Sequence, residues 1–266
     1  MHTPVPTGTV LDRILEARRA EVEHRKKVLP ETALKYGVAA ATPLRDFSAA
    51  LTRLGINVLA ELKPASPSRG ILREPFDPVS LAASLESAGA AALSVLTEGE
   101  FFRGTLKNLR DARKSIQIPV LRKDFIFDPW QIWETRANDA DSFLLIVAAL
   151  NDNQLGALLA LARELKMEPL VEVHTPAELE RALGVGAKII GVNNRNLKTL
   201  DVRVETSFEL IEKIPDDCIA VSESGISSHA EIAKLHAAGF DAFLVGTSLM
   251  LDPDPAAALS ALLGKQ

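Results

Sequence analysis

The sequence predicts an α/β protein, a (β/α)8 TIM barrel with an N-terminal helical extension. Eight short apolar runs alternate with helix-like segments from about residue 57 onward. Their starts lie about 20–35 residues apart, which is the length of one βα unit. Aromatic residues make up only 5% of the 266 residues, so we expect an aliphatic core of parallel strands under helices. We expect a single domain over residues 1–266, with the extension at 1–50 and the barrel at 51–266.

The extension is expected to form a helix over residues 10–28. Leu11, Ile14 and Leu15 fall on one side of that helix, and charged residues cover most of the rest. A cluster of cations, His24 to Lys27, could be taken for a nucleic-acid patch. Because cations near a helix C-terminus interact favourably with its dipole, we interpret this cluster as a solvated helix end.

The eight expected strands are short and mostly apolar, as strands buried on both faces should be. They are Asn57–Lys63, Ala91–Thr97, Pro119–Phe125, Ser142–Ala148, Pro169–Val173, Lys188–Asn193, Ile219–Ser224 and Ala242–Gly246.

Helix start signals lie between these runs. Asp77, Asp128 and Thr175 each stand before a proline, and this pair forms a good N-cap and first helical residue. The expected helices are 78–88, one from 129, 151–166, one from 176, 228–238 and 255–263. An open doubly wound sheet is the competing fold. It usually carries a glycine-rich nucleotide loop after its first strand, and no GxGxxG or GxxxxGK[ST] motif occurs in this chain.

Composition excludes several classes of protein. The net charge of −5 disfavours nucleic-acid binding, so an anionic ligand would need local cations and backbone N–H groups. The single cysteine, Cys218, excludes an intramolecular disulfide. The N-terminus lacks a secretory signal, and the longest apolar run, Phe143–Leu150, is too short to cross a bilayer. We therefore expect a cytoplasmic protein without a membrane or nucleic-acid partner.

Charged residues gather at the ends of the expected strands, where barrel active sites form. Side chains two residues apart point to the same face of a strand, so Glu61 and Lys63 should share a face. Lys123 and Glu172 end two other strands in the same way. We expect two lysines and two carboxylates in one mouth, able to act as acids and bases. Glu223, facing opposite to Ser224, is interpreted as a strand–helix salt-bridge partner.

Two Gly-Ser turns follow the last two expected strands, at Ser224–Ser227 and Gly246–Ser248. Many barrels bind phosphate with these loops and a helix N-terminus, and glycine lets an oxyanion approach the backbone. Ser66, after the first strand, could add a hydroxyl from across the mouth. The five histidines show no metal-ligand spacing, so we expect no metal site.

Six segments, taken in chain order, closely resemble signatures of the indole-3-glycerol phosphate synthase family. They are ELKPASPSRG at 61–70, LRKDFI at 121–126, PLVEV at 169–173, GVNNRNL at 191–197, SESGI at 222–226 and LVGTSLM at 244–250. VLDRIL at 10–15 is also family-like. The chain departs from the family pattern at Pro64, where a basic residue often follows the lysine, and at Thr247, where serine is common.

The resemblance implies a carboxy-lyase of tryptophan biosynthesis that needs no cofactor. Its implied substrate is 1-(2-carboxyphenylamino)-1-deoxyribulose 5-phosphate, an anionic anthranilate phosphosugar, which is converted to indole-3-glycerol phosphate, carbon dioxide and water. The resemblance carries catalytic roles onto Glu61, Lys63, Lys123, Glu172, Asn193 and Ser224. It carries substrate and phosphate binding onto Ser66, Phe102, Phe125, Arg195, Gly225, Gly246 and Thr247, with the two phenylalanines as walls of an aromatic pocket.

Within that reaction, we expect Lys123 to protonate the former ketone oxygen during ring closure. Glu172 and Lys63 would be base and acid in dehydration, with Glu61 positioning them. How the two lysines divide the steps is left open, as is the choice between a monomer and a weak homodimer. Two other functions stay open: a phosphosugar isomerase or Schiff-base lyase using Lys63 or Lys123, and a non-catalytic phosphate-binding barrel.

Overall fold

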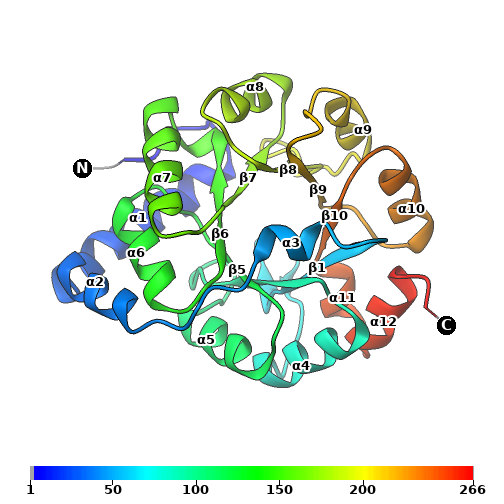
Figure 1. Ribbon diagram of the computed structural model, residues 1–266, viewed down its shortest axis with the longest axis horizontal. Helices are drawn as coiled ribbons and strands as arrows, with labels where there is room; N and C mark the ends of the chain where they lie inside the picture. Colours follow the sequence, from blue (N-terminus) through cyan, green and yellow to red (C-terminus); the bar gives the residue numbers. More distant parts are fainter. Residues whose placement is uncertain (1–2, 266) are drawn as a thin grey trace.

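Eight parallel strands close into a barrel in the computed structural model, which describes residues 3–265 (Figure 1). In chain order they are β1 (Asn57–Leu62), β4 (Ala92–Leu96), β5 (Val120–Lys123), β6 (Ser142–Ile146), β7 (Leu170–Val173), β8 (Ile189–Asn193), β9 (Ile219–Glu223) and β10 (Ala242–Val245). Each strand pairs with the next, and β10 closes the barrel on β1. The predicted barrel is confirmed, and each of its eight strands lies inside a predicted run.

Helices surround the barrel, as the alternating pattern predicts. They are α4 (Pro78–Ala88), α5 (Leu106–Ser115), α6 (Pro129–Ala137), α7 (Asp152–Glu164), α8 (Pro176–Gly184), α9 (Glu205–Ile211), α10 (His229–Ala237) and α12 (Pro255–Leu262). Two shorter segments follow strands directly: η1 (Val147–Ala149), a 3-10 turn, and α11 (Thr247–Leu251). The side chains of Asp77, Asp128 and Thr175 accept N–H groups of α4, α6 and α8, so the predicted N-caps are confirmed.

The N-terminal extension places helices at opposite ends of the barrel. It contains α1 (Val10–Val28), α2 (Glu31–Ala39) and α3 (Phe47–Leu51). Helix α3 lies over the end where the strands begin, in front of the barrel in Figure 1. The Asn57 side-chain amide ties this end together by donating to the carbonyls of Leu51 (3.0 Å) and Arg53 (2.8 Å). Helix α1 instead reaches the end where the strands finish.

Helices α1 and α2 lie against α6 of the barrel. Arg25 pairs with Glu134 at 2.5 Å, and Lys26 pairs with Asp128 at 2.8 Å. The Trp130 indole N–H donates to the carbonyl of Leu29 at 2.9 Å. The interpretation of the cluster as a solvated helix end therefore holds for His24 and Lys27, which are exposed, and only in part for Arg25 and Lys26, which are 32% and 31% exposed. Both cations face carboxylates on α6 that the sequence pattern could not place beside them.

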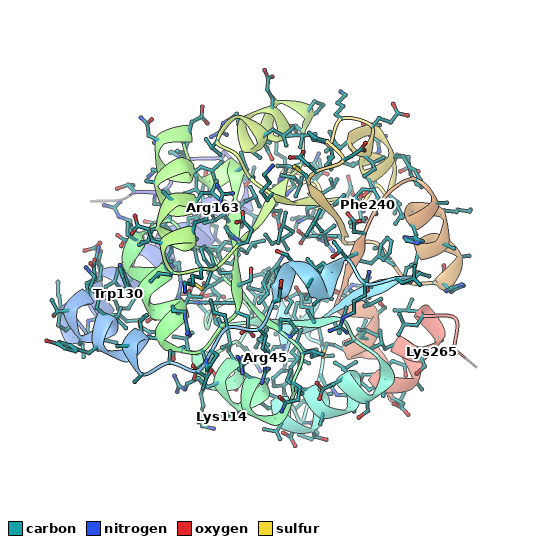
Figure 2. All side chains as sticks on the ribbon, viewed as in Figure 1. Arg45, Lys114, Trp130, Arg163, Phe240 and Lys265 are labelled. Atoms are coloured by element: carbon teal, nitrogen blue, oxygen red, sulfur yellow. The ribbon has the colours of Figure 1, made fainter. Side chains whose placement is uncertain are left out.

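The core fills the barrel and the layer between barrel and helices, as the side chains in Figure 2 show. Trp130 under the extension and Phe240 before β10 are both buried. A small antiparallel pair, β2 (Ala65–Ser66) with β3 (Gly70–Ile71), projects from the end of β1. No helix in the described part of the chain has the length and apolarity needed to cross a membrane.

Candidate active site

A cavity of about 600 Å³ opens at the carboxyl ends of the strands. Every site residue predicted from the sequence lines it: Glu61, Lys63, Ser66, Phe102, Lys123, Phe125, Glu172, Asn193, Arg195, Ser224, Gly225, Gly246 and Thr247. These residues come from strand ends and loops spread over most of the barrel. The closed barrel brings them together because all eight strands end at the same side.

Lys123 is the centre of the charged floor of this cavity. Its Nζ lies 3.2 Å from an oxygen of Glu172 and 2.7 Å from an oxygen of Glu223. Lys63 pairs with Glu61 at 2.5 Å, so the two residues share a face as their spacing predicts. All five side chains are largely withdrawn from solvent, the most exposed being Lys63 at 15%. The cluster therefore combines strong electrostatic interactions with low water access.

The interpretation of Glu223 as a strand–helix partner is wrong, because Glu223 points into the barrel. Its neighbour Ser222 points outward, where its hydroxyl lies 2.8 Å from that of Ser207 on α9. Val221 and Glu223 thus form the inward series of β9. Ser224 lies past the strand with a φ of 69°, so strand alternation does not apply to it. If the alternation is counted from Val221 inside the strand rather than from Ser224 beyond it, Glu223 falls on the inward face.

His174 is a second residue that the sequence reasoning missed. Its Nε2 lies 3.3 Å from Glu172, and its Nδ1 lies 3.0 Å from Glu178 on α8. Burial lowers the pKa of His174, but the contacts with these two carboxylates outweigh it and raise the pKa to about 10. His174 is therefore a cation at neutral pH. The sequence could have pointed to His174 through its position two residues after Glu172, on the same side of the strand.

Different surroundings separate the pKa values of the two glutamates beside Lys123. Burial raises the pKa of Glu172, but Lys123 and His174 together hold it well below its usual range. Burial raises the pKa of Glu223 to about 7, against the attraction of Lys123. Burial lowers the pKa of Lys123, yet the surrounding carboxylates keep it above its usual range. Lys123 and Glu172 are thus charged at neutral pH, whereas Glu223 exchanges a proton near pH 7.

The two glycine turns meet on one side of the cavity. The Ser248 hydroxyl donates to the carbonyl of Ile226 at 3.3 Å, which links the loop after β9 to the start of α11. Gly225 has a φ of 82°, a conformation that favours glycine. Thr247 and Ser248 are the first residues of α11, and such first-turn N–H groups have no partner within their own helix. The start of α11 is therefore a candidate place for an anion.

Helix α10 does not contribute its N-terminus to this place. A carboxylate oxygen of Glu231 accepts the backbone N–H groups of Ser227 (2.8 Å) and Ser228 (3.0 Å). A negative side chain therefore already fills the start of α10. The start of α11, rather than the predicted helix near Ser228, is therefore the candidate helix N-terminus for an anion.

Gly246 has a role that its sequence position did not reveal. A Cβ atom there would lie 2.4 Å from Oε1 of Glu61, so Glu61 packs directly against the glycine backbone. Any larger residue at 246 would displace Glu61. The glycine thus serves the acid–base cluster as well as the proposed phosphate site.

An aromatic and cationic rim completes the cavity. The rings of Phe102 and Phe125 lie with centroids 5.9 Å apart. The Arg195 guanidinium donates to the carbonyl of Leu200 at 2.9 Å, which fixes it at the mouth. Asn193 orients this loop, because its side-chain oxygen accepts the N–H of Arg195 at 3.0 Å. The planar part of a ligand would therefore pack on the two phenylalanine rings, while its anionic part would contact Arg195.

A sequence profile of the family "Indole-3-glycerol phosphate synthase" matches residues 11–262. The chain belongs to the indole-3-glycerol phosphate synthase family. The indole-3-glycerol phosphate synthase of Rhodococcus jostii (strain RHA1) is 48% identical over 255 residues, covering 96% of this chain and 95% of that protein. That of Chlorobium chlorochromatii (strain CaD3) is 48% identical over 249 residues, covering 92% and 97%.

Solved structures of other proteins share the fold alone. The 3-hexulose-6-phosphate synthase of Salmonella typhimurium superposes with a TM-score of 0.64 at 13% identity, covering 78% of this chain and 97% of its own. A variant of mandelate oxidase superposes with a TM-score of 0.61 at 16% identity, covering 88% and 84%. Membership of the indole-3-glycerol phosphate synthase family therefore rests on sequence, because proteins outside the family share the barrel fold.

Membership of the indole-3-glycerol phosphate synthase family decides between the functions that the sequence left open. The protein is a carboxy-lyase of tryptophan biosynthesis that acts on a small phosphorylated substrate. A phosphosugar isomerase, a Schiff-base lyase and a non-catalytic barrel are set aside. Among residues 3–265, no three His, Cys, Asp or Glu side chains are grouped to hold a metal ion.

Proposed function

We propose that the cavity binds 1-(2-carboxyphenylamino)-1-deoxyribulose 5-phosphate and that its lysines and glutamates carry out the conversion to indole-3-glycerol phosphate, carbon dioxide and water. One observation carries the assignment of these residues. The Lys123 ammonium lies between the carboxylates of Glu172 and Glu223 on a floor that has an aromatic wall and an anion site on its rim. This arrangement matches a substrate with an aryl ring at one end and a phosphate at the other.

Binding uses opposite sides of the mouth. The phosphate lies at the turn of Gly225 and at the start of α11, where Thr247 and Ser248 offer N–H groups. The anthranilate ring lies against Phe102 and Phe125. These two anchors hold the ketone carbon and the ring carbon that bears the carboxylate near each other and near Lys123, so the substrate is oriented for ring closure.

Ring closure is assigned to Lys123. The ring carbon that bears the carboxylate attacks the ketone carbon, and the electron pair of the carbonyl bond moves to oxygen. Lys123 donates a proton to that oxygen, giving a hydroxyl group. The ammonium is charged throughout the neutral range and already oriented, so it stabilises negative charge as it develops. Glu223, at 2.7 Å and with a pKa of about 7, can return a proton to Lys123.

Decarboxylation and dehydration complete the conversion. The electron pair of the breaking carbon–carboxylate bond restores the aromatic ring, so this step needs no electron-accepting group from the protein. Lys63, held by Glu61 at 2.5 Å, protonates the departing hydroxyl, and Glu172 takes a proton from the substrate. The two lysines thus act in separate steps. Glu223 can return a proton to Lys123, and Glu61 holds Lys63 in place.

The test is the fluorescence of the indole product formed from the named substrate. Wild-type protein should give the signal, and folded Lys123→Met should lose nearly all of it. A parallel incubation with borohydride distinguishes the lysine roles. A stable covalent adduct on Lys63 or Lys123 would contradict acid–base use of these lysines and indicate a Schiff base.

We infer a cytoplasmic location from the biosynthetic pathway to which the family belongs. We also infer a monomer or a weak homodimer. Sedimentation velocity between micromolar and millimolar concentration tests the second inference, and a stable higher oligomer at micromolar concentration would contradict it.

A further inference from the structure

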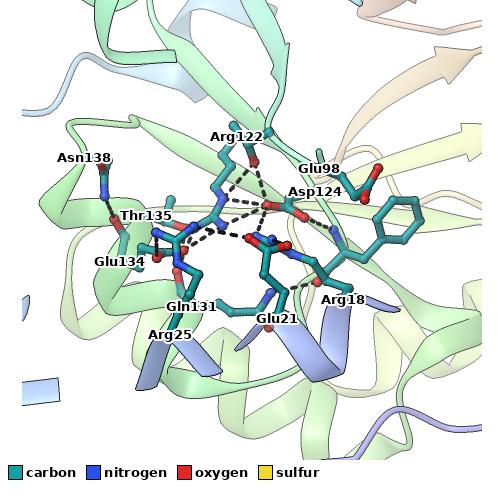
Figure 3. Close-up of polar contacts among 12 residues, drawn as sticks. Arg18, Glu21, Arg25, Glu98, Arg122, Asp124, Gln131, Glu134, Thr135 and Asn138 are labelled. Atoms are coloured by element: carbon teal, nitrogen blue, oxygen red, sulfur yellow. Dashed lines mark hydrogen bonds and ion pairs between the residues drawn. The ribbon is translucent and has the colours of Figure 1, made fainter. Parts of the chain in front are cut away.

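A buried ion pair joins the N-terminal extension to the strand that carries Lys123. Arg18 lies in the middle of α1, and it is only 1% exposed. Its NH2 group lies 2.7 Å from Oδ2 of Asp124, the residue directly after Lys123 (Figure 3). More than 100 positions separate the two residues in the chain. A buried charge of this kind needs a paired partner, so α1 is fixed to the end of β5 at this point.

Both carboxylate oxygens of Asp124 accept hydrogen bonds. Its Oδ2 accepts from Arg18, from the Thr97 hydroxyl at 2.6 Å and from Arg122 at 2.8 Å. Its Oδ1 accepts the N–H of Phe125 at 2.8 Å. Burial raises the pKa of Asp124, but Arg18 and Arg122 outweigh it and hold the pKa below its usual range. The carboxylate is therefore charged and held in one orientation.

The same contacts fix the backbone on both sides of Asp124. The N–H of Thr97 donates to the carbonyl of Lys123 at 3.1 Å, and Asp124 itself holds the N–H of Phe125. Lys123 and Phe125 both enter the cavity, one as the cation of its floor and one as part of its wall. The direction in which both side chains leave the backbone thus depends on how Asp124 is held.

Arg18 and Arg122 neutralise Asp124 together. Arg122 is shared, because its NH2 group also lies 2.8 Å from Glu134, whose side chain is fully buried. Without Arg18, Asp124 and Glu134 would compete for the guanidinium of Arg122. Arg25, the other partner of Glu134, lies partly in solvent and does not reach Asp124 in the structure. Loss of Arg18 therefore leaves the carboxylate next to Lys123 only partly compensated.

We propose that Arg18 is a positioning residue for the reaction: through Asp124 it fixes the orientation of Lys123 and Phe125 in the cavity. This inference rests on the proposed role of Lys123 as the acid. It also explains why the extension belongs to the site. Val10, Leu11 and Ile14 line the cavity from the same helix, and Ile14 stands one turn before Arg18 on the same face.

The chain offers a matched control for the loss of a buried arginine–aspartate pair. Arg113 on α5 is also buried, and it binds Asp141 through two hydrogen bonds of 2.9 and 3.0 Å. Asp141 stands just before β6, at the end of the barrel where strands begin. Removing either arginine costs a buried ion pair, but only Arg18 touches the neighbour of Lys123.

The experiment compares Arg18→Met, Arg18→Lys and Arg113→Met in the indole fluorescence assay, with folding checked by circular dichroism. We expect Arg18→Met to lower kcat about 10–100-fold with little change in KM, because a small misplacement of a catalytic group has effects of this size. Arg18→Lys, which keeps a charge, should recover most of kcat. Arg113→Met should lower the melting temperature and leave kcat within about twofold.

Two results with a folded Arg18→Met variant would overturn the inference. One is folded Arg18→Met with wild-type kcat. This holds even if KM rises, because α1 would then only line the cavity and would not position Lys123. The other is an equal loss of kcat in Arg18→Met and Arg113→Met.

If Arg18→Met does not fold, Thr97→Val replaces it. This variant removes one hydrogen bond to Asp124 at nearly constant volume. A kcat in Thr97→Val equal to that of wild type would then overturn the inference.

Lys123→Met, measured in the same series, separates this inference from the proposed function. If folded Lys123→Met keeps wild-type turnover, the proposed role of Lys123 fails. If Lys123→Met is inactive and Arg18→Met is fully active, the role of Lys123 stands and the positioning role of Arg18 fails.

Discussion

Lys123 is the residue at which most of the charge in the cavity converges. Two carboxylates contact its ammonium, and a third, Glu61, contributes to holding its proton. Such a group supplies a proton only where negative charge develops within reach, which happens at the substrate oxygen during ring closure. Its contribution should therefore appear in the transition state rather than in substrate binding.

Lys123→Met and Glu172→Gln should each lower kcat by about 10²–10⁴, with a much smaller change in KM. The double variant should be less than additive if both residues act in one rate-limiting step. Steady-state kinetics of the folded variants provides the measurement, with exposed Lys114→Met as the control. A folded single variant with wild-type kcat would remove that residue from its assigned role.

Glu223 gives the protein a dependence of stability on pH. Its pKa is raised from an ordinary value near 4.5 to about 7, because burial disfavours its charge. Between these two pH values the folded state keeps a proton that the unfolded state has released. The stabilisation is fully present below pH 4.5 and is lost as the pH rises through about 7.

Glu223→Gln removes this titration. The free energy of unfolding of wild type, relative to Glu223→Gln, should fall as the pH rises from about 4.5 to about 7. Urea unfolding at several pH values measures this difference, with exposed Glu164→Gln as the control. A constant difference across the range would show that Glu223 is already ionised in the folded protein.

Among the elements, α11 carries the clearest functional prediction. This short helix begins at the cavity, and its first N–H groups are the proposed phosphate donors. Substitution of Gly246 is a poor test of that role, since a side chain there would also push Glu61 away. A change of charge at the start of the helix is cleaner.

Thr247→Asp should raise KM at least about tenfold with little loss of kcat, because its carboxylate repels the phosphate while remaining favourable at a helix N-terminus. Thr247→Asn has the same shape without the charge and should stay close to wild type. Steady-state kinetics and inhibition by inorganic phosphate provide the measurements. Equal KM values for the two variants would place the phosphate elsewhere.

The eight barrel strands and seven of the helices could be read from the sequence, because buried parallel strands form apolar runs and several helices begin with a cap residue followed by proline. Helices α2, α3, α5, α9 and α11 were not predicted. In α5 the buried positions Leu106, Leu109 and Ala112 stand among polar and charged residues, and α9 has no side chain capping its start. Helix α5 does carry local signals that the prediction overlooked, an N-cap at Thr105 and apolar residues three positions apart, whereas α9 becomes a helix because the barrel offers it a surface to cover.

At the scale of the whole molecule, we propose that the extension and the barrel form one domain. The extension closes one end of the barrel with α3, and α1 is joined to β5 and α6 by ion pairs at the other. A single cooperative unfolding transition, observed by both calorimetry and fluorescence, would support this proposal. Separate melting of the extension would contradict it.

Catalysis by the whole protein should survive exhaustive chelation. The histidine spacing in the sequence does not match a metal site, and the proposed mechanism uses lysines and glutamates alone. The measurement is turnover after dialysis against EDTA, compared with untreated protein. Loss of activity that a divalent cation restores would overturn the cofactor-free reaction.

The sequence by itself determined the barrel, its strand ends and thirteen of the residues that line the cavity. It could do so because strand burial and alternation are local patterns, and the family motifs stand at the strand ends. Only the tertiary structure decided which charged groups meet. Glu223 and His174 join Lys123 and Glu172 across the barrel, and Arg18 reaches Asp124 from a helix far away in the chain. Ion pairs depend on distances between residues remote in sequence, and those distances exist only once the barrel has closed.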